Sequence, residues 1–220
     1  MFDFQYLQML LMRVDILIHR EVKRWQRANA DAADLLRGQY ISDAEVNALL
    51  KQPFGSHWRY MVAPPTAAEG EVYGRSLART DEQIAQLLGR HPDETPRLLH
   101  LQQAFGLSDL ERDILLLALA PALDLRYERL YGYLLDDATR KRPSVNLLLD
   151  LLCPPGPERL HHLALFSPEG TLLKNEFVRT VAEAGMGQAA PAEYGRCARP
   201  PRWWAGWWAI TCPMRNWGNL

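Results

Sequence analysis

The segment FGLSDLERDILLLALAPALDLRYERLYGYLLDD, residues 105–137, contains the clearest helix signals in the chain. Gly106 is suited to end a first helix, because glycine readily adopts the left-handed conformation found just after helix C-termini. Ser108 and Glu111 have the spacing of a capping box, in which each side chain accepts a hydrogen bond from the other residue's backbone amide. The helix that they begin contains Ile114–Leu119, which is apolar on every side. We expect that helix to be buried on most of its faces.

A third helix follows a corner in the same segment. Pro121 is expected to close the central helix because proline has no amide hydrogen, and Asp124 can cap the helix that comes next. The inward stripe of this next helix is predicted to comprise Leu125, Tyr127, Leu130, Tyr131, Leu134 and Leu135. The segment therefore predicts three consecutive helices, with the most apolar one in the middle.

Two more helices are indicated after this segment. A basic turn and Pro143 precede Ser144, which is placed to cap an apolar helix that ends at Leu152. The segment PPGPERLHHLALF, residues 154–166, stops that helix and predicts one more short helix.

The segment GTLLKNEFVRTV, residues 170–181, has strand-like character and a turn signal at Lys174–Asn175. Short helices, a helix after a basic loop and then an extended pair follow one another in the order of a winged-helix domain. We expect residues 168–181 to form the wing. The predicted fold is mainly α, with an N-terminal helical region and a winged-helix-like domain that carries a small β wing.

The N-terminal part predicts further helices. Residues 4–27 read as one long amphipathic helix, whose apolar stripe consists of Leu7, Leu10, Leu11, Val14, Leu17, Ile18, Val22 and Trp25. Ser42 and Glu45 form another capping box. A helix over residues 71–90 has an apolar side made of Val72, Leu77, Ile84, Leu87 and Leu88. We expect a helical region at residues 1–55, a Gly- and Pro-containing linker at 56–70, the winged-helix-like domain at 71–181 and a tail at 182–220.

Residues 105–160 resemble a known family over a long, ungapped stretch that begins FGLSDLERDILLLALAPALDLRYERLYGYLLDD and continues ATRKRPSVNLLLDLLCPPGPERL. The resemblance extends over roughly residues 4–181, through REVKRWQ in the first helix and LRGQYISDAEV after it. The family is the N-terminal winged-helix module of AAA+ ATPases associated with contractile injection systems, which are phage-tail-like particles. The resemblance implies a bacterial adaptor or positioning module that precedes the ATPase domain and is itself non-catalytic.

The ATPase activity of those relatives does not carry over to this chain. A phosphate-binding loop needs the pattern G-x-x-x-x-G-K-[ST], and the sequence contains no Gly-Lys dipeptide. Tyr133–Asp137, YLLDD, only superficially resembles a magnesium-binding strand end, because its periodicity is helical. We expect no cofactor in this chain; ATP and magnesium are expected only for a full-length relative.

The tail contains five of the seven tryptophans of the chain: Trp203, Trp204, Trp207, Trp208 and Trp217. Tryptophan has the single codon UGG, so reading one base earlier converts each Trp to Leu, Val or Met. The segment WWAGWW then becomes an ordinary apolar sequence. We expect the chain to leave its frame between about residues 182 and 202 and to stop before the ATPase domain. An interfacial membrane anchor and a protein-binding aromatic patch are the alternatives.

Charge and cysteine content narrow the functional classes. The formal net charge is −1, and residues 1–189 hold 21 basic and 25 acidic groups, because the remaining residues carry four arginines and one acidic residue. An acidic body gives no general attraction to nucleic acid. Three cysteines without a C-x-x-C pair argue against a disulfide framework or structural zinc. We expect a cytoplasmic protein without a membrane span; the sequence gives no oligomeric state.

Arg140, Lys141 and Arg142 form the one compact basic cluster, immediately before the helix that a winged-helix fold would use for recognition. They are candidates for contact with a partner or with phosphate. The following helix is mostly apolar, with Asn146 and Asp150 as its polar side chains, whereas reading of base edges needs outward polar residues. A protein contact is therefore favoured, and a winged-helix DNA-binding regulator is the alternative.

A second candidate surface lies on the helix before that basic cluster. Tyr127 and Tyr131 recur at helical spacing with Arg126 and Arg129 between them, which could make a docking face for a partner. Packing of the two tyrosines in the core is the competing interpretation. His161 and His162 are adjacent and therefore point in different directions on a helix, so they do not form a metal site together.

Overall fold

The computed structural model describes residues 1–28, 47, 50–51, 66–154, 156, 158–182 and 208–211. Its helices are α1 (Phe2–Ala28), α4 (Ala67–Arg90), α5 (Arg97–Phe105), α6 (Asp109–Leu123), α7 (Arg126–Leu135), α8 (Val145–Leu152) and α9 (Glu158–His162), then the 3₁₀ helix η1 (Leu163–Phe166) and α10 (Thr171–Lys174). The strands are β1 (Arg179–Ala182) and β2 (Trp208–Thr211). The described part is mainly α, as the sequence predicts.

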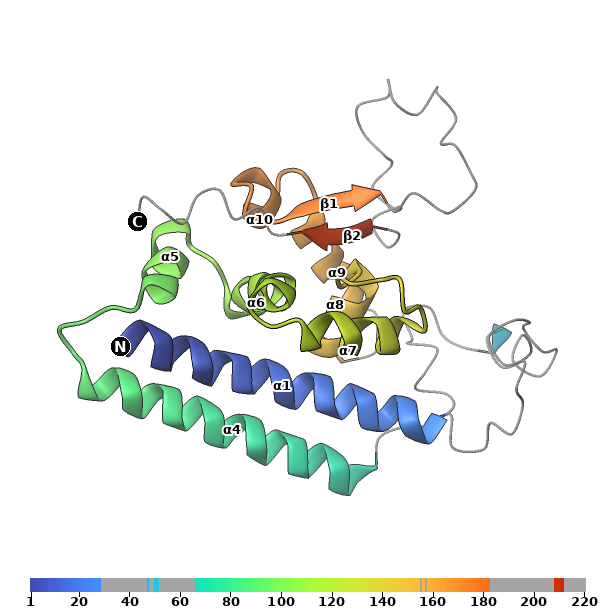
Figure 1. Cartoon of the computed structure of the whole chain (residues 1–220), viewed down its shortest axis with the longest axis horizontal. Coiled ribbons are helices and arrows are strands. Elements are labelled where there is room, and N and C mark those ends of the chain that lie inside the picture. The colour runs from blue at the N-terminus through green and yellow to red at the C-terminus, as the bar shows by residue number, and fades with distance from the viewer. Residues whose placement is uncertain are drawn as a thin grey trace.

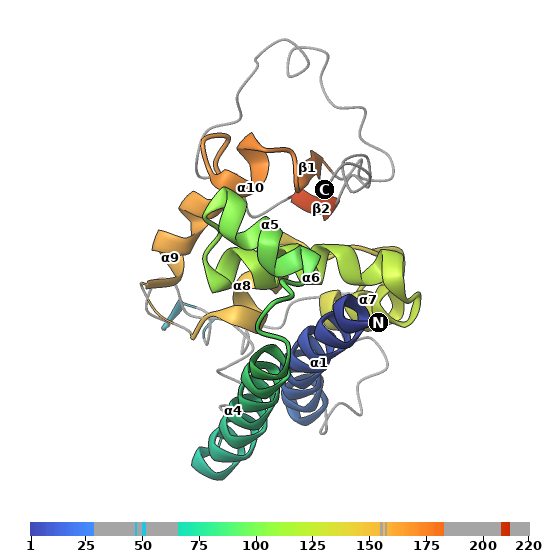
Figure 2. The same ribbon diagram turned by 90° about the vertical axis from the view of Figure 1, so that its left-hand side faces the viewer.

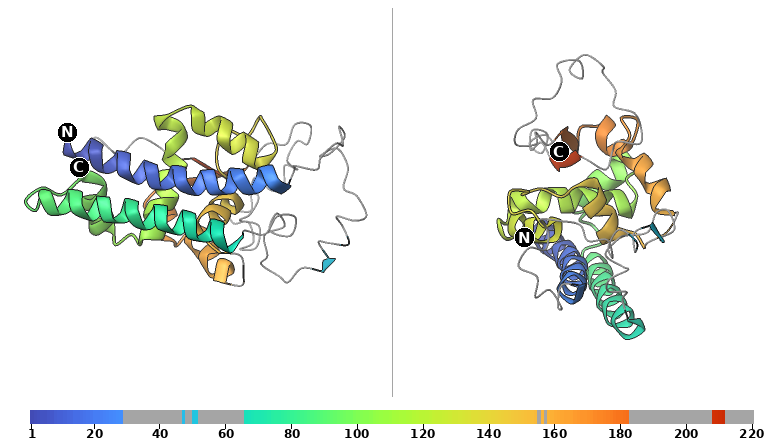
Figure 3. Two further views of the ribbon diagram at one scale, coloured as in Figure 1. Left: turned by 90° about the horizontal axis from the view of Figure 1, so that it is seen from below. Right: turned by 90° about the vertical axis from the view of Figure 1, so that its right-hand side faces the viewer.

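Helix α1 lies in the middle of the molecule. Helix α4 runs antiparallel along one side of it, and α6, α7 and α8 pack on its other side (Figure 1). Figure 2 shows that the α1–α4 pair projects from the remaining helices, and the view from below in Figure 3 shows the two helices side by side along their length. Side chains of α1, α6, α7 and α8 share one hydrophobic cluster, so α1 belongs to the same core as the predicted winged-helix-like domain.

Helix α4 begins earlier than the predicted start at residue 71. The Thr66 side chain accepts a hydrogen bond from the Glu69 backbone amide, and the Glu69 carboxylate accepts one from the Thr66 amide. This capping box makes residues 67–70 helical, although the sequence placed them in the linker. Val72 is exposed rather than on the buried side of α4. The Ser42–Glu45 capping box and residues 56–65 lie outside the described residues.

Three predicted helix ends, at Gly106, Ser108 and Ser144, are confirmed. Gly106 ends α5 in the left-handed conformation, with φ of 63°. Ser108 caps α6, and its amide and hydroxyl both donate to the Glu111 carboxylate. Ser144 accepts a hydrogen bond from the Leu147 amide and thereby caps α8. These helix ends form where expected because a cap depends on residues only a few positions apart.

The wing expected in residues 168–181 is not confirmed. Residues 171–174 form the helical turn α10 instead of a strand. The turn directs Leu172 into the core, where it is fully buried, and the Val178 amide bonds the Leu172 carbonyl oxygen. β1 pairs antiparallel with β2 from the tail, with Thr180 opposite Ile210. Residues 183–207 and 212–220 lie outside the described part, and the proposal that the tail is out of frame stays a prediction.

Pro121 does not close α6, which continues to Leu123. A proline at this position cannot donate the usual helical hydrogen bond to the carbonyl oxygen of Leu117. The buried Tyr131 hydroxyl of α7 donates to that oxygen instead, at 2.7 Å. Burial raises the pKa of Tyr131 well above its ordinary value, which keeps the hydroxyl protonated and able to donate. The helix therefore tolerates its proline because a neighbouring helix supplies the missing donor.

We expect Tyr131→Phe to lower the free energy of unfolding by about 1–3 kcal/mol, because the Leu117 carbonyl is left buried without that donor. Pro121→Ala restores an amide to the helix at this position. In the Pro121→Ala background the Tyr131→Phe change is expected to cost less than about 1 kcal/mol. Urea unfolding of the four proteins of this cycle measures the coupling. Equal losses in both backgrounds would show that Tyr131 does not replace the proline's missing donor.

Candidate functional site

Helix α8 follows the basic loop and is the helix that the sequence identified as a possible recognition helix. Its side chains Val145, Leu148 and Leu151 have an exposed fraction of 0%. The helix packs against α1 and α6. Side chains that read bases must reach outward into a groove of the duplex. The apolar face of α8 is committed to the core instead.

Two arginines from other helices also hold α8. Arg159 of α9 forms an ion pair with Asp150 and donates from Nη2 to the backbone oxygen of Asn146 at 3.2 Å. Arg20 of α1 donates to the backbone oxygen of Leu151 at 2.7 Å. Asn146 is the one exposed residue of α8, since the remaining residues are buried or half-buried. The helix therefore offers a single exposed polar side chain for recognition.

The three side chains of the basic cluster have different surroundings. Arg140 donates from Nε to the Asp137 carboxylate at 3.2 Å, which is an ion pair within the loop. The Lys141 ammonium lies 3.5 Å from the Glu128 carboxylate of α7. Arg142 is exposed, and it forms no ion pair with the described residues. Two of the three cations are therefore paired with carboxylates of the loop and of α7.

The loop between α7 and α8 packs closely on α7. Asp136 ends α7 with φ of 55°, and the Asp137 amide donates to the Gly132 carbonyl oxygen at 2.9 Å. A Cβ atom on Gly132 would lie 3.1 Å from the Asp137 carbonyl oxygen, so glycine allows this close approach. Hydrogen bonds from Thr139 lower the pKa of Asp137, which keeps its carboxylate charged opposite Arg140.

The two tyrosines of the predicted docking face are in the core. Tyr127 is 1% exposed and Tyr131 0% exposed, so their rings form no external face. The Tyr127 hydroxyl donates to Asp15 of α1 at 2.7 Å, and burial raises the pKa of Tyr127 to about 12. Arg126 is exposed but is held by Asp15 at 2.7 Å and by Asp124 at 3.1 Å. Core packing is confirmed for Tyr127 and Tyr131.

The outer face of α7 is formed by different residues. Leu125 is 71% exposed and Tyr133 is 44% exposed, and Arg129 lies between them on the same side. Leu125 was expected on the inward stripe, but it precedes the first residue of α7 and lies at a corner of the chain. The four-residue steps from Leu125 to Arg129 and from Arg129 to Tyr133 are the sequence signal for this face.

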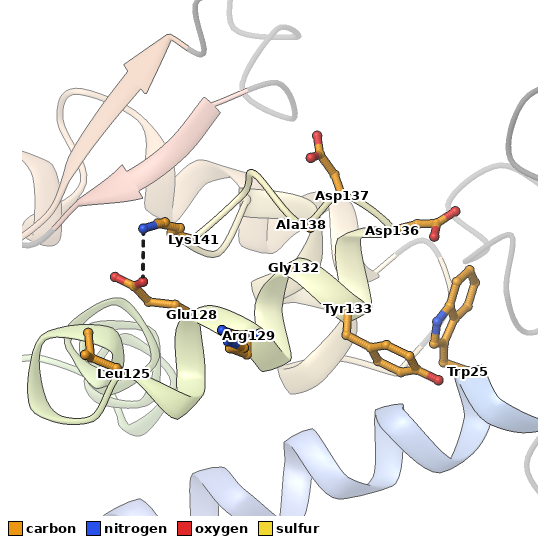
Figure 4. Close-up of a pocket in the computed structure, with 10 residues that line it drawn as sticks. All are labelled: Trp25, Leu125, Glu128, Arg129, Gly132, Tyr133, Asp136, Asp137, Ala138 and Lys141. Atoms are coloured by element: carbon orange, nitrogen blue, oxygen red, sulfur yellow. Dashed lines mark ion pairs between the residues drawn. The ribbon is translucent and has the colours of Figure 1, made fainter.

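This face borders a groove with a volume of about 740 Å³. Figure 4 shows Leu125 at one end, Tyr133 beside Trp25 of α1 at the other, and Arg129 between them. The Trp25 and Tyr133 rings meet edge to face, with centroids 6.3 Å apart. Its lining comprises Trp25, Leu125, Glu128, Arg129, Gly132, Tyr133, Asp136, Asp137, Ala138 and Lys141. The groove thus combines aromatic, aliphatic and charged groups.

Comparison with protein families decides the class of the chain. Residues 2–192 match the family described as "Winged helix domain, variant". The chain belongs to this winged-helix family. No curated protein and no solved structure is significantly similar to it. The family match includes α1 and α4 as well as the helices after them, so these two helices are part of the winged-helix module.

In the part of this winged-helix chain that the structure describes, no group of three or more His, Cys, Asp or Glu side chains is arranged to hold a metal ion. Within the same residues, no helix is both long and apolar enough to cross a lipid bilayer. The candidate recognition features of this winged-helix module are the groove along α7 and the loop after it.

Proposed function

We propose that this winged-helix chain is a non-catalytic adaptor module that binds a protein partner in the cytoplasm. The burial of α8 carries the proposal. A winged-helix protein that reads DNA presents this helix to the major groove, whereas Leu148 and its neighbours here face α1 and α6. The resemblance of residues 105–160 to the modules that precede AAA+ ATPase domains in contractile injection systems supports the same role.

The charges around α8 also favour a protein partner. Binding to a duplex depends on cations that neutralise phosphates and release counterions. Arg140 and Lys141 are already paired with Asp137 and Glu128, so contact with phosphate would require breaking those pairs. Arg142 is exposed and is the observation that supports the alternative, a DNA-binding regulator. One exposed arginine supplies about one phosphate contact, which is too few for tight binding.

Duplex binding by the full chain separates the two functions. We expect a labelled duplex of about 25 base pairs to bind with a dissociation constant no lower than about 10⁻⁶ M at physiological salt, in the range of non-specific association. Fluorescence anisotropy at two salt concentrations measures this. The control is Arg142→Ala, which should leave that weak binding nearly unchanged. Nanomolar binding that weakens steeply with salt and is lost in Arg142→Ala would overturn the adaptor proposal in favour of the regulator.

A further inference from the structure

We infer that the groove along α7 binds a helical segment of the partner that places a carboxylate against Arg129 and an apolar side chain beside Leu125. This inference rests on the proposed adaptor function and says where on the chain the partner docks. The surface is defined by Leu125, Arg129 and Tyr133, with Trp25 as the wall contributed by α1.

This surface has exposed apolar side chains although α7 already buries a complete face in the core. Tyr127, Tyr131 and Leu134 of α7 are all buried, so the helix has already supplied its core face. Leu125 nevertheless stays 71% exposed and Tyr133 44% exposed, at opposite ends of the groove. Leucine and tyrosine that border a concave site next to an arginine have the composition of protein-contact surfaces, in which aromatic residues and arginine carry much of the binding energy.

Charge determines what the occupant must carry. The Lys141 ammonium is paired with Glu128, and Arg140 is paired with Asp137. Arg129 is exposed in the centre of the groove and forms no ion pair with the described residues. A carboxylate of the partner would give Arg129 a counter-ion, while Asp136 stays outside these pairs.

Asp136 gives the docked segment a direction. It lies at the C-terminal end of α7, beyond Arg129 and next to Asp137. Two carboxylates at that end repel a third one, and the C-terminus of a helix carries partial negative charge of its own. The partner's carboxylate is therefore favoured at the middle of the groove rather than at the Asp136 end.

The backbone of the groove favours a helical occupant over an extended one. Its longest wall is α7, whose interior amide and carbonyl groups are bonded within the helix. An extended peptide would find few partners there for its own backbone groups, whereas a helix satisfies them internally.

A displayed library of random helical peptides, selected on the full chain, tests this surface. The enriched peptides are labelled and titrated by fluorescence polarisation against the wild type, Arg129→Glu and Leu125→Ala. We expect each substitution to weaken binding about tenfold or more. The matched control is Arg75→Glu on α4, because Arg75 is also exposed, with 76% of its side chain accessible. This control should change the affinity less than about twofold.

A reversal of charge makes the test specific. Exchanging the peptide carboxylate for lysine should restore binding to Arg129→Glu and abolish it for the wild type. The inference is overturned if the selection yields no peptide whose affinity depends on Arg129 and Leu125. Peptides that bind independently of both residues would reject the groove and leave the adaptor function standing. Tight, salt-sensitive duplex binding would instead reject the adaptor function itself.

Discussion

Leu148→Ala is expected to lower the free energy of unfolding by about 2–5 kcal/mol, which is the range for leucine to alanine substitutions in close-packed cores. Leu148 has an exposed fraction of 0% and is a member of the main hydrophobic cluster. Its removal leaves a cavity on the side of α8 that faces the core. Urea unfolding followed by circular dichroism at 222 nm measures the change, because the described fold is mainly helical.

The matched control on the same helix is Asn146→Ala. Asn146 is exposed, and its backbone oxygen, which accepts from Arg159, is kept by the alanine variant. We expect a change within about 1 kcal/mol. If the two substitutions had similar effects on stability, α8 would not be the core helix that the structure shows. A small effect of Leu148→Ala together with loss of duplex binding in Asn146→Ala would favour the DNA-binding regulator.

Helix ends were the part of the fold that the sequence specified best. Ser108 and Glu111 interact across three residues, and Gly106 acts through its own backbone conformation. Such signals do not depend on the rest of the chain. The Thr66–Glu69 capping box has the same spacing but follows two prolines in a segment without periodicity, so composition concealed it.

Positions that depend on distant contacts were predicted less well. Leu125 was placed on the inward stripe with Tyr127 and Tyr131, but it precedes α7, and the chain turns there and leaves Leu125 exposed. Residues 171–174 have strand propensity, yet α10 forms there because a helical turn buries Leu172. At residues 171–174, tertiary burial overrides local propensity.

In the candidate site, too, the contacts between distant residues were not predictable from the sequence. The sequence displays the positive charges of Arg140, Lys141 and Arg142, but their partners depend on how the loop folds back over α7. Trp25 reaches the groove from a helix far away in the sequence, so no spacing rule links it to Tyr133. Arg129 was named as a docking residue from its helical spacing, and the structure places it in the groove without testing that role.

Asp113→Ala is expected to lower the free energy of unfolding by about 3 kcal/mol, the lower part of the range for breaking a buried ion pair. Asp113 is 4% exposed. Arg13 of α1 donates to one of its carboxylate oxygens, and Arg112 donates to the other at 2.9 Å. Removing the carboxylate leaves two arginines without their shared partner. The effect stays in the lower part of the range because the Arg13 side chain is 22% accessible to solvent.

The matched control is Asp81→Ala, which removes a different partner of the same arginine. Asp81 of α4 accepts from Arg13 Nε at 2.9 Å, but its side chain is 52% exposed. Water replaces much of this interaction, so we expect a change of about 1 kcal/mol or less. Thermal and urea unfolding of both variants distinguish a buried link from a surface pair. Equal effects would contradict the expectation that the buried ion pair stabilises the fold more than the exposed one. A large effect of Asp113→Ala alone would show that the buried link between α1 and α6 contributes more to stability than the exposed pair between α1 and α4.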